Sequence, residues 1–563
     1  MKKFKNESLL FLLIILILAA FLRFWHLGKV PPSPDWDEAA LGYNAYSILK
    51  TGKDEYGKFL PLILRSFDDY KPAVYVYLVI PAIKIFGLNT FAVRLPAAII
   101  GTLAVLLVYY LVNELFANGS KNENKLVKSL TRNKLIALTA SFLLAISPWH
   151  LHFSRVAFET QVGLFFDVLI VFLILKSFQK PALLLLAAFF AGLNIYVYQA
   201  EKIFTPLLLL VFLIIWREKI FSLPKKYLFL AMIIGLVLII PFIYLTLTTP
   251  EIFLRAKGTS VMADQTPFLS RTVEKLIRDK ENKDLIGLIL DNRRITYFKT
   301  FIAGWLSHFD LNWLFLTGDE ARHHAPGMGL MYLWELPFLL FGIYELIFGN
   351  YPRRAKVFLF SWLAIAPIPA SFTTGVPHAV RTIRILPIPQ ILVALGLVAA
   401  VKFLQEKSRV WRFLVAGVGI MFFIFNFVYY LNQYFVQQNY FYSSSWQYGY
   451  RQAIEEIQKI EKNYQKIVVS NRPHLDQSYM FFLFYLKYDP QKYQESGGTV
   501  SGGFAESHKG FEKYTFRPIK WEEEEKSEKI LYVGRPQDFP EGVKLIKTIY
   551  FLNGEPAICL VEG

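Results

Sequence analysis

Two acidic residues, Asp37 and Glu38, stand beside Trp36 shortly after the first apolar stretch of the chain. A carboxylate at such a place can accept a proton from a hydroxyl group when its surroundings hold it rigidly and tune its pKa. Asp37 could also cap a helix beginning near Ala39, because acidic groups favour the positive end of a helix dipole. The two interpretations are compatible, since a capping carboxylate is held rigidly.

A second cluster, residues 150–159, contains His152, Arg155 and Glu159. Arg155 and Glu159 are four residues apart, so on a helix they would share one face and could form an ion pair. The planar guanidinium of Arg155 is equally suited to holding a phosphate through two parallel hydrogen bonds. The spacing leaves both roles open.

Residues 318–326 read Gly-Asp-Glu-Ala-Arg-His-His-Ala-Pro and combine acids, an arginine and two histidines that could bind a metal ion or a phosphate: Asp319, Glu320, Arg322, His323 and His324. Adjacent histidines point in different directions on regular structure, so the pair alone predicts a two-histidine metal site only weakly.

A fourth cluster, residues 373–384, contains His378, Arg381 and Arg384. Arginine at a membrane boundary often extends to lipid headgroups. Arginines with that structural role concentrate on the cytoplasmic side, however, and the topology below places this cluster outside. The position therefore favours a functional role for Arg381.

The composition indicates a polytopic membrane protein, with 54% hydrophobic and 19% charged residues. The net charge of +17 lies in short Lys and Arg clusters between apolar stretches, the positive-inside pattern, and this argues against a nucleic-acid partner. The single cysteine, Cys559, excludes an internal disulfide and a cysteine-rich metal site. The motifs GxxxxGK[ST], HExxH and CxxC are also missing from the sequence.

A membrane-spanning helix needs about 20 apolar residues, and basic loops should alternate to the cytoplasmic side. Residues 8–27 then form a retained first span with a cytoplasmic N-terminus, and about 11 spans follow from the hydropathy in total. Residues 72–88 are short and contain Pro81, so we expect an interfacial or re-entrant helix there. The four clusters all fall on the extracytoplasmic face of a multi-pass plasma (inner) membrane protein.

We expect an α-helical membrane domain at 1–432, with a first outer loop at 28–91 and a long outer loop at 248–327 that is too long to be a simple connector. Beyond it, residues 433–563 should form a small extracytoplasmic α/β domain of unknown role. Its predicted strands and helix are residues 468–472, 478–488 (the helix), 530–535 and 548–552.

Four motifs of the membrane part form a recognisable set: DEAALGYNAYSIL with Asp37 and Glu38, KPAVYVYL with Lys71, RLPAA with Arg94, and SRVAFE with Arg155 and Glu159. They resemble the GT-C superfamily of polyprenyl-phosphate-sugar-dependent glycosyltransferases, in particular its protein O-mannosyltransferase and lipid A aminoarabinose transferase group. The resemblance is strong over 30–105, looser up to about 430, and absent from the C-terminal domain. Ala73 replaces a second proline of the family pattern, and Glu159 stands where many members have Asp.

The resemblance implies that a sugar moves, with inversion, from a polyprenyl-phosphate donor to a hydroxyl group of a protein, lipid or glycan acceptor. Asp37 would be the general base, with Glu38 and Glu159 as further catalytic acids. The donor phosphate and sugar would be held by five cationic or imidazole side chains: Lys71, Arg94, Arg155, His324 and Arg381. Related enzymes imply either no cofactor or a divalent metal ion, which Asp37 and Glu159 could share.

Two other functions compete with a glycosyltransferase. A lipid or solute transporter, such as a flippase of the cell envelope, would place charged or broken helices near the middle of the bilayer, often in repeated halves. The clusters here lie in outer loops. An assembly scaffold would only bind envelope partners, and loss of activity in an Asp37 variant separates it from an enzyme.

Overall fold

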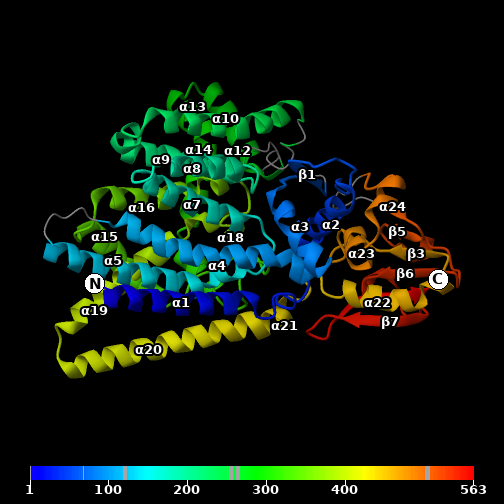
Figure 1. The fold of residues 1–563 in the computed structure, drawn as a ribbon. Coiled ribbons are helices and arrows are strands. Elements are labelled where there is room, and N and C mark those ends of the chain that lie inside the picture. Colours follow the sequence, from blue (N-terminus) through cyan, green and yellow to red (C-terminus); the bar gives the residue numbers. More distant parts are fainter. Residues whose placement is uncertain are drawn as a thin grey trace.

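The computed structural model describes residues 2–67, 69–117, 123–249, 252, 258–261, 267–500 and 508–563. Most of the chain is a bundle of long helices, and a smaller part with a β-sheet follows at the C-terminus (Figure 1). The helices of the bundle are α1 (Lys2–Phe24), α4 (Thr90–Leu115), α5 (Glu123–Ile146), α7 (Thr160–Ser177), α8 (Leu183–Asn194), α9 (Glu201–Phe221), α10 (Lys225–Thr248), α15 (Glu335–Phe348), α16 (Arg353–Ile365), α19 (Ile388–Gln405) and α20 (Arg409–Asn432).

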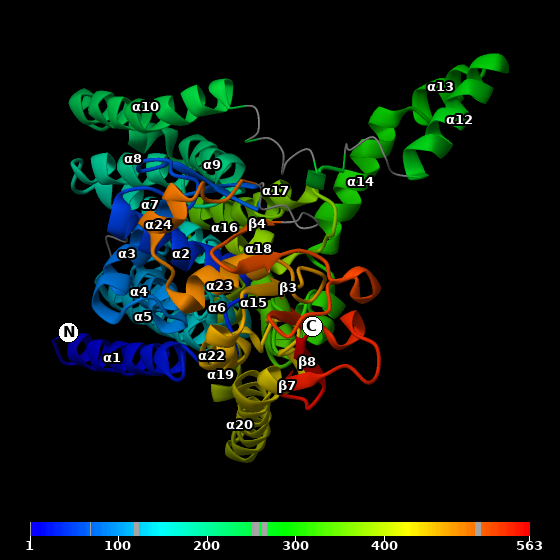
Figure 2. The ribbon, with the colours of Figure 1, turned by 90° about the vertical axis from the view of Figure 1, so that its right-hand side faces the viewer.

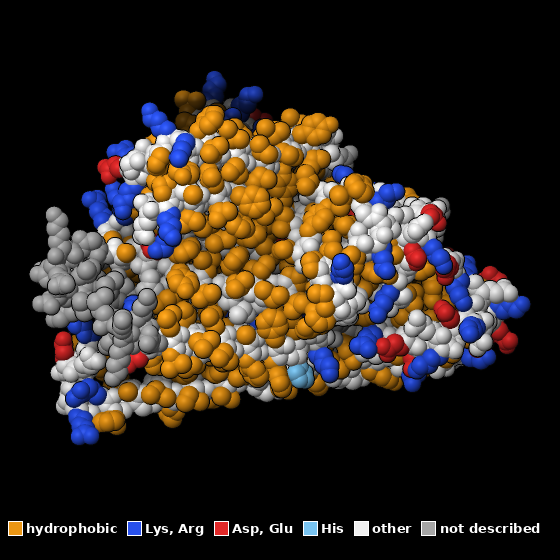
Figure 3. Space-filling model, in the orientation of Figure 1, with side chains coloured by type: hydrophobic (Ala, Val, Ile, Leu, Met, Phe, Trp, Pro, Cys, Tyr) orange, Lys and Arg blue, Asp and Glu red, His pale blue; other side chains and the backbone are white. Residues whose placement is uncertain are grey.

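The bundle exposes apolar side chains on its outside. No residue of α10 is buried, and Tyr430 is the buried residue of α20. Figure 3 shows this apolar surface as a broad band, with Lys and Arg side chains at one end of the bundle and mixed charges on the C-terminal part at the other. Within the described residues, six helices are long and apolar enough to cross a bilayer. The protein is therefore a helical, multi-pass membrane protein, and the total of about 11 spans stays a prediction.

The first outer loop contains α2 (Trp36–Thr51), an antiparallel hairpin of β1 (Ile63–Ser66) and β2 (Asp69–Pro72), and α3 (Val74–Phe86). Helix α2 ends at Gly52, whose positive φ of 72° glycine adopts without strain. Helix α3 has 13 residues, fewer than a span requires. It lies with α2 at one end of the bundle (Figure 1).

The long outer loop is largely helical where the structure describes it. It contains α12 (Pro267–Glu281), α13 (Leu285–Leu290), α14 (Arg293–Ser307) and a π-helix at Trp313–Thr317. Figure 2 shows α12 and α13 projecting away from the bundle as an arm. Short helices flank the neighbouring turns: α6 (Pro148–Phe153), α17 (Ile368–Ser371), α18 (Ala379–Thr382), a 3-10 turn at Ile383–Ile385, a π-helix at Gln433–Gln437 and α21 (Gln438–Tyr442).

The C-terminal part is built around a six-stranded sheet of order β4-β5-β3-β6-β8-β7. Strand β3 pairs in parallel with β5 and β6, and the other pairs are antiparallel. The predicted strands at 468–472, 530–535 and 548–552 correspond to β3, β6 and β7, and the predicted helix to α23. The elements are α22 (Tyr450–Ile460), β3 (Lys466–Val469), α23 (Ser478–Leu486), α24 (Pro490–Glu495), β4 (His508–Phe511), β5 (Tyr514–Phe516), β6 (Ile530–Gly534), β7 (Leu545–Tyr550) and β8 (Pro556–Glu562), with 3-10 turns at Glu461–Asn463, Trp521–Glu523 and Pro536–Asp538.

Helices α23 and α24 of the C-terminal part pack directly on α2 of the first outer loop. The contact is close at Gly42, where a Cβ atom would lie 2.6 Å from a ring carbon of Phe484 and 2.7 Å from a methyl group of Val93. Helix α2 is thus held between the bundle and the C-terminal part, which lie on either side of it (Figure 1).

Helices α15 and α19 pack with their backbones in contact. A Cβ atom on Gly342 would lie 1.8 Å from the carbonyl oxygen of Leu392, and one on Gly396 would lie 2.1 Å from that of Phe338. Small residues permit such close approach of helices in membranes. The opposing atoms belong to helical backbone, so they cannot move aside as a side chain can.

We predict that Gly342→Ala destabilises the protein by about 1–3 kcal/mol, because the added methyl group forces α15 and α19 apart. Gly235→Ala is the matched control: Gly235 lies in α10, and an added Cβ atom there would meet no neighbouring atom of the described residues within 4 Å. There alanine should raise helix stability by about 0.5–1 kcal/mol. Thermal unfolding of both variants in detergent measures the difference, and equal melting temperatures would contradict the packing argument.

Candidate active site

A buried ion pair fixes the start of α2. Arg94 donates from Nε to Glu38 Oε1 at 2.8 Å and from Nη2 to Glu38 Oε2 at 2.7 Å, and both side chains are 0% exposed. Oε1 also accepts the backbone N–H of Ala157 at 2.8 Å. The remaining Arg94 donors go to the backbone carbonyl oxygens of three residues: Leu27, Pro31 and Ser33.

This geometry gives Glu38 and Arg94 a positioning role, in place of the catalytic and donor-binding roles predicted from the sequence. All five guanidinium N–H groups of Arg94 are directed at protein oxygens, so none is left for a phosphate. Helix α4, which carries Arg94, thereby holds both the first turn of α2 and the chain that leads into it.

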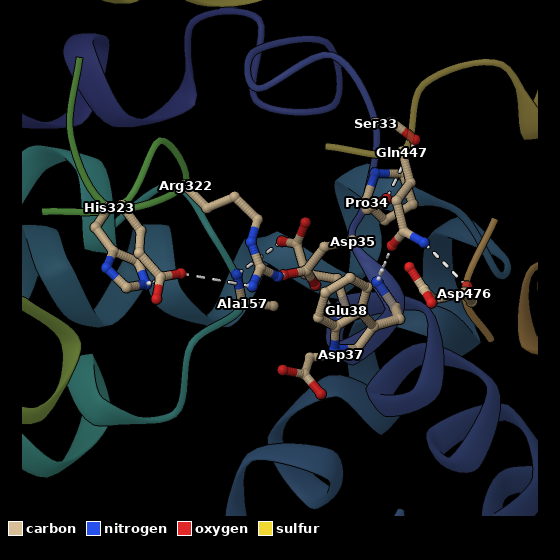
Figure 4. Close-up of polar contacts among 12 residues, drawn as sticks. Ser33, Pro34, Asp35, Asp37, Glu38, Ala157, Arg322, His323, Gln447 and Asp476 are labelled. Atoms are coloured by element: carbon tan, nitrogen blue, oxygen red, sulfur yellow. Dashed lines mark hydrogen bonds and ion pairs between the residues drawn. The ribbon is translucent and has the colours of Figure 1, made fainter. Parts of the chain in front are cut away.

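Asp35, and not Asp37, caps α2. Its Oδ1 accepts the backbone N–H of Glu38 at 2.9 Å, and the helix begins at Trp36. The other oxygen, Oδ2, accepts from Arg322 Nη1 at 2.7 Å (Figure 4). Burial raises the pKa of Asp35 to about 6, and the charge of Arg322 opposes this rise. The guanidinium of Arg322 also lies 4.3 Å from the ring centre of Trp36.

Asp37 is the accessible acid of this turn. Its side chain is 30% exposed, whereas the Asp35 and Glu38 side chains are fully buried. It forms an ion pair with Lys71 on β2, whose side chain is 12% exposed. Burial lowers the pKa of Lys71, but the charges of Asp37, Glu159 and Asp69 outweigh burial and raise it above its usual value. The ammonium group is therefore charged at neutral pH.

The predicted helical pairing of Arg155 with Glu159 is wrong, because the helix is interrupted between them. Helix α6 ends at Phe153, and Glu159 is the residue before α7. Arg155 is buried, and its terminal nitrogens donate to the backbone carbonyl oxygens of Leu22, Arg23 and Val30. The structure thus places Arg155 as a brace between α6 and the end of α1, not as a phosphate ligand. Glu159 faces the charge of Lys71 instead.

An apolar pocket of about 330 Å³ lies beside the hairpin that carries Lys71. It is lined by Tyr198, Phe242 and Phe372 together with the cations Lys202 and Arg381. A wall residue, Gln199, donates to the backbone oxygen of Tyr70 at 2.6 Å and so joins the pocket to β2. Arg381 is partly exposed and donates to Thr373 and Thr374.

His324 is buried against Gly318, where its ring would lie 2.4 Å from an added Cβ, and its Nδ1 lies 2.8 Å from the carbonyl oxygen of Ala325. The described contacts of this ring are with its own loop and with Tyr442. Arg384, the other arginine of its cluster, is fully buried in an ion pair with Glu201 at 2.8 Å. None of these contacts of His324 and Arg384 involves Asp37 or Lys71.

The sequence analysis missed Asp35 and the role of Arg322. A signal was present, because Asp35 and Glu38 have the spacing of a capping motif at a helix start. Gln447, in the C-terminal part of the chain, was also missed. Its Oε1 accepts the backbone N–H of Trp36 at 3.1 Å, and its Nε2 donates to the carbonyl oxygen of Asp476 (Figure 4). Nothing in the spacing of residues over 400 positions apart could have indicated that contact.

We predict that Glu38→Ala and Arg94→Ala each destabilise the protein by about 3–5 kcal/mol, because each leaves a buried charge without its partner. Glu38→Gln should cost less, since the amide oxygen can still accept from Ala157 or Arg94. Unfolding in detergent gives the stabilities, and the double variant gives the coupling. Additive losses in the double variant would contradict the buried pair as the source of stability.

Comparisons with known proteins identify similar sequences and folds. Residues 13–120 match the family model described as "Dolichyl-phosphate-mannose-protein mannosyltransferase". A stretch of 225 residues is 30% identical to the putative mannosyltransferase YkcB of Bacillus subtilis, and it covers 38% of this chain and 27% of that relative. The chain thus matches about a quarter of the length of that curated relative.

Two solved structures share the fold. ArnT from Cupriavidus metallidurans in the apo state has a TM-score of 0.53 and 12% identity, with 99% of this chain and 98% of that chain covered. The oligosaccharyltransferase AglB from Archaeoglobus fulgidus, in complex with an inhibitory peptide and a dolichol-phosphate, has a TM-score of 0.50 and 14% identity over 85% of this chain and 64% of that chain. ArnT has also been solved bound to undecaprenyl phosphate. Residues 13–120 are therefore similar to the dolichyl-phosphate-mannose-protein mannosyltransferase family, and the chain as a whole shares the fold of ArnT, as the resemblance to the GT-C superfamily predicted.

Proposed function

We propose that the protein is a membrane glycosyltransferase that moves a sugar from a polyprenyl-phosphate donor to a hydroxyl acceptor, with inversion at the anomeric carbon. The observation that carries the proposal is that the three acidic side chains at the start of α2 have different surroundings. Asp35 and Glu38 are buried and engaged with Arg322 and Arg94, whereas Asp37 is accessible and sits against the Lys71 cation. Such an arrangement presents one rigid carboxylate with a positive charge beside it.

The pocket beside β2 is the site we propose for the donor. Its apolar wall suits an isoprenoid chain, and Lys202 and Arg381 bring positive charge for a phosphate. The similar proteins ArnT and AglB have been solved with undecaprenyl phosphate and with dolichol-phosphate respectively, and this supports a lipid-linked donor. Lateral entry from the bilayer fits a pocket walled by α10, a helix with no buried residue.

In the proposed reaction, Asp37 accepts the proton of the acceptor hydroxyl, and the oxygen of that hydroxyl forms a bond to the anomeric carbon. The bond between that carbon and the phosphate oxygen breaks, and polyprenyl phosphate leaves with the electron pair. Lys71 and Arg381 stabilise the growing phosphate charge, and such fixed donors contribute more inside a protein than in bulk water. Glu159 contributes to this step through its effect on the charge of Lys71.

A divalent ion shared by Asp37 and Glu159 was the alternative. The described geometry does not fit it well, because Lys71 pairs with Asp37 and also feels the charge of Glu159. The ammonium group thus supplies positive charge between the two acids, and no step of the mechanism passes through a metal there.

The orientation of the protein in the membrane is inferred from the distribution of its Lys and Arg side chains. The first outer loop and the C-terminal part lie at one end of the bundle (Figure 1). We propose that this end is extracytoplasmic and the N-terminus cytoplasmic in the plasma membrane, because the Lys and Arg side chains gather at the opposite end (Figure 3).

We predict that Asp37→Asn lowers turnover by about 10²–10⁴-fold, because the amide cannot accept the proton. The assay incubates the purified protein with a panel of polyprenyl-phosphate sugars and detects released polyprenyl phosphate. Asp310→Asn is the matched control, since Asp310 is exposed and its amide analogue can still accept the backbone N–H of Asn312. Wild-type turnover by folded Asp37→Asn protein would overturn the assignment, and sugar movement across the membrane without release would favour a transporter.

We predict that Lys71→Met lowers kcat by about 10²–10³-fold, the usual cost of removing one donor that stabilises transition-state charge. Lys71→Arg should recover part of the loss because the positive charge is kept. Both variants are compared with wild type by kcat and KM for the lipid donor. A change confined to the stability of the protein, with kcat unaltered, would show that Lys71 has only a structural role and would contradict the proposed stabilisation of the phosphate.

A further inference from the structure

Two outer segments that are far apart in the sequence meet in a cluster of three side chains: Asp319, His323 and His378. Asp319 and His323 belong to the long outer loop, and His378 belongs to the turn before α18. One ligand atom from each of the three side chains lies within 4.8 Å of the others. Neither sequence cluster predicted this site alone, because each supplies only part of it.

One nitrogen from each of the two histidines approaches the same carboxylate oxygen. Asp319 Oδ2 lies 3.0 Å from His323 Nδ1 and 3.9 Å from His378 Nδ1. It also accepts the backbone N–H of Ala379 at 2.8 Å, which fixes its direction. The second oxygen, Oδ1, is buried and has no hydrogen-bond partner among the described residues. The carboxylate thus has a buried lone-pair site that the protein itself leaves unsatisfied.

The cluster is enclosed but not sealed. The side chains are 11% exposed for Asp319, 5% for His323 and 13% for His378, so each keeps some contact with solvent. The His323 ring is packed beside the Phe153 and Phe158 rings, and its centre lies 4.9 Å from that of His378. On the far side of the ring, Nε2 lies 4.0 Å from Glu320 Oε2. A carboxylate there is the usual outer partner of a metal-bound histidine.

This donor set favours Zn²⁺. Two imidazole nitrogens and one carboxylate, with a water in the fourth position, form a common tetrahedral zinc environment. Bond lengths of about 2.0–2.2 Å place tetrahedral ligand atoms roughly 3.3 Å apart. The separations of 3.0 and 3.9 Å lie on either side of that value, and the ligand atoms, all within 4.8 Å of one another, would have to draw together around an ion.

We propose that Asp319, His323 and His378 bind one Zn²⁺ ion that fastens the long outer loop to the turn before α18. The ion positions the loop that carries Arg322, next to His323 in the chain, whose guanidinium holds the capping residue Asp35 at the start of α2 (Figure 4). This site is separate from Asp37 and Glu159, and its existence does not depend on the proposed glycosyl transfer.

The test uses the full-length protein in detergent, with the affinity tag removed and bound metal stripped by a chelator. We expect one Zn²⁺ per chain by mass spectrometry of the metal and by competition with a chromophoric chelator. His378→Gln and Asp319→Asn should each weaken binding by more than about 100-fold, the upper range for loss of a mere outer partner. His324→Gln and Cys559→Ser are the matched controls, because neither residue belongs to the cluster, and both should keep the ion.

A second measurement on the wild type alone covers the case in which a variant does not fold. Zn²⁺ should raise the melting temperature of the stripped protein and slow amide exchange in residues 318–326 and 373–384 together. Binding of no Zn²⁺ by the wild type, protection of only one of the two segments, or unchanged affinity in His378→Gln and Asp319→Asn would each overturn the proposal. Loss of turnover in the Asp37 variant with Zn²⁺ still bound would leave the two proposals independently supported.

Discussion

The buried ion pair between Glu38 and Arg94 is the constraint on which the rest of the site depends. A charge placed in the interior of a helical bundle is costly unless hydrogen bonds satisfy all of its donors and acceptors. Here Arg94 has five protein acceptors and Glu38 has donors from two separate segments, Arg94 on α4 and Ala157 before α7. The pair therefore ties the first outer loop to the bundle at one defined position and orientation of α2.

Once α2 is fixed, helix geometry separates the three acids at its start. Side chains at successive positions of a helix point about 100° apart, so neighbours in sequence serve different surroundings. Glu38 faces the bundle, Asp35 faces Arg322 of the long outer loop, and Asp37 faces Lys71 of the hairpin. Burial and close pairing make the first two rigid, and such rigidity would support Asp37 in the role of general base that we propose for it.

The sequence predicted those features that depend on local patterns. Apolar stretches of about 20 residues located the helices of the bundle, and alternation with turn residues located strands such as β3 and β6 in the C-terminal part. The two motifs that contain Asp37 and Lys71 mark segments whose side chains the structure brings together in an ion pair. Local patterns could not show which arginine side chains donate hydrogen bonds to backbone carbonyl oxygens. Arg94 and Arg155 acquire those partners only when α1, α4 and α6 pack. An arginine in a family motif was therefore interpreted as a ligand where the structure uses it as a brace.

The same limit explains why the C-terminal part appeared to have no role. Its contacts with α2 come from residues more than 400 positions away, which no periodicity can reveal. Gln494 donates to Ser47, Thr51 and the backbone of Asp54, and Thr499 donates to the buried carboxylate of Glu55. Burial raises the pKa of Glu55 to about 7, and the hydrogen bonds from Asn44 and Thr499 oppose this rise by stabilising the carboxylate in the interface. The first outer loop is thus shaped from two directions, by Arg94 from the bundle and by the C-terminal part from the opposite side. The C-terminal part is for that reason a structural component of the site that carries Asp37, and not an independent appendage.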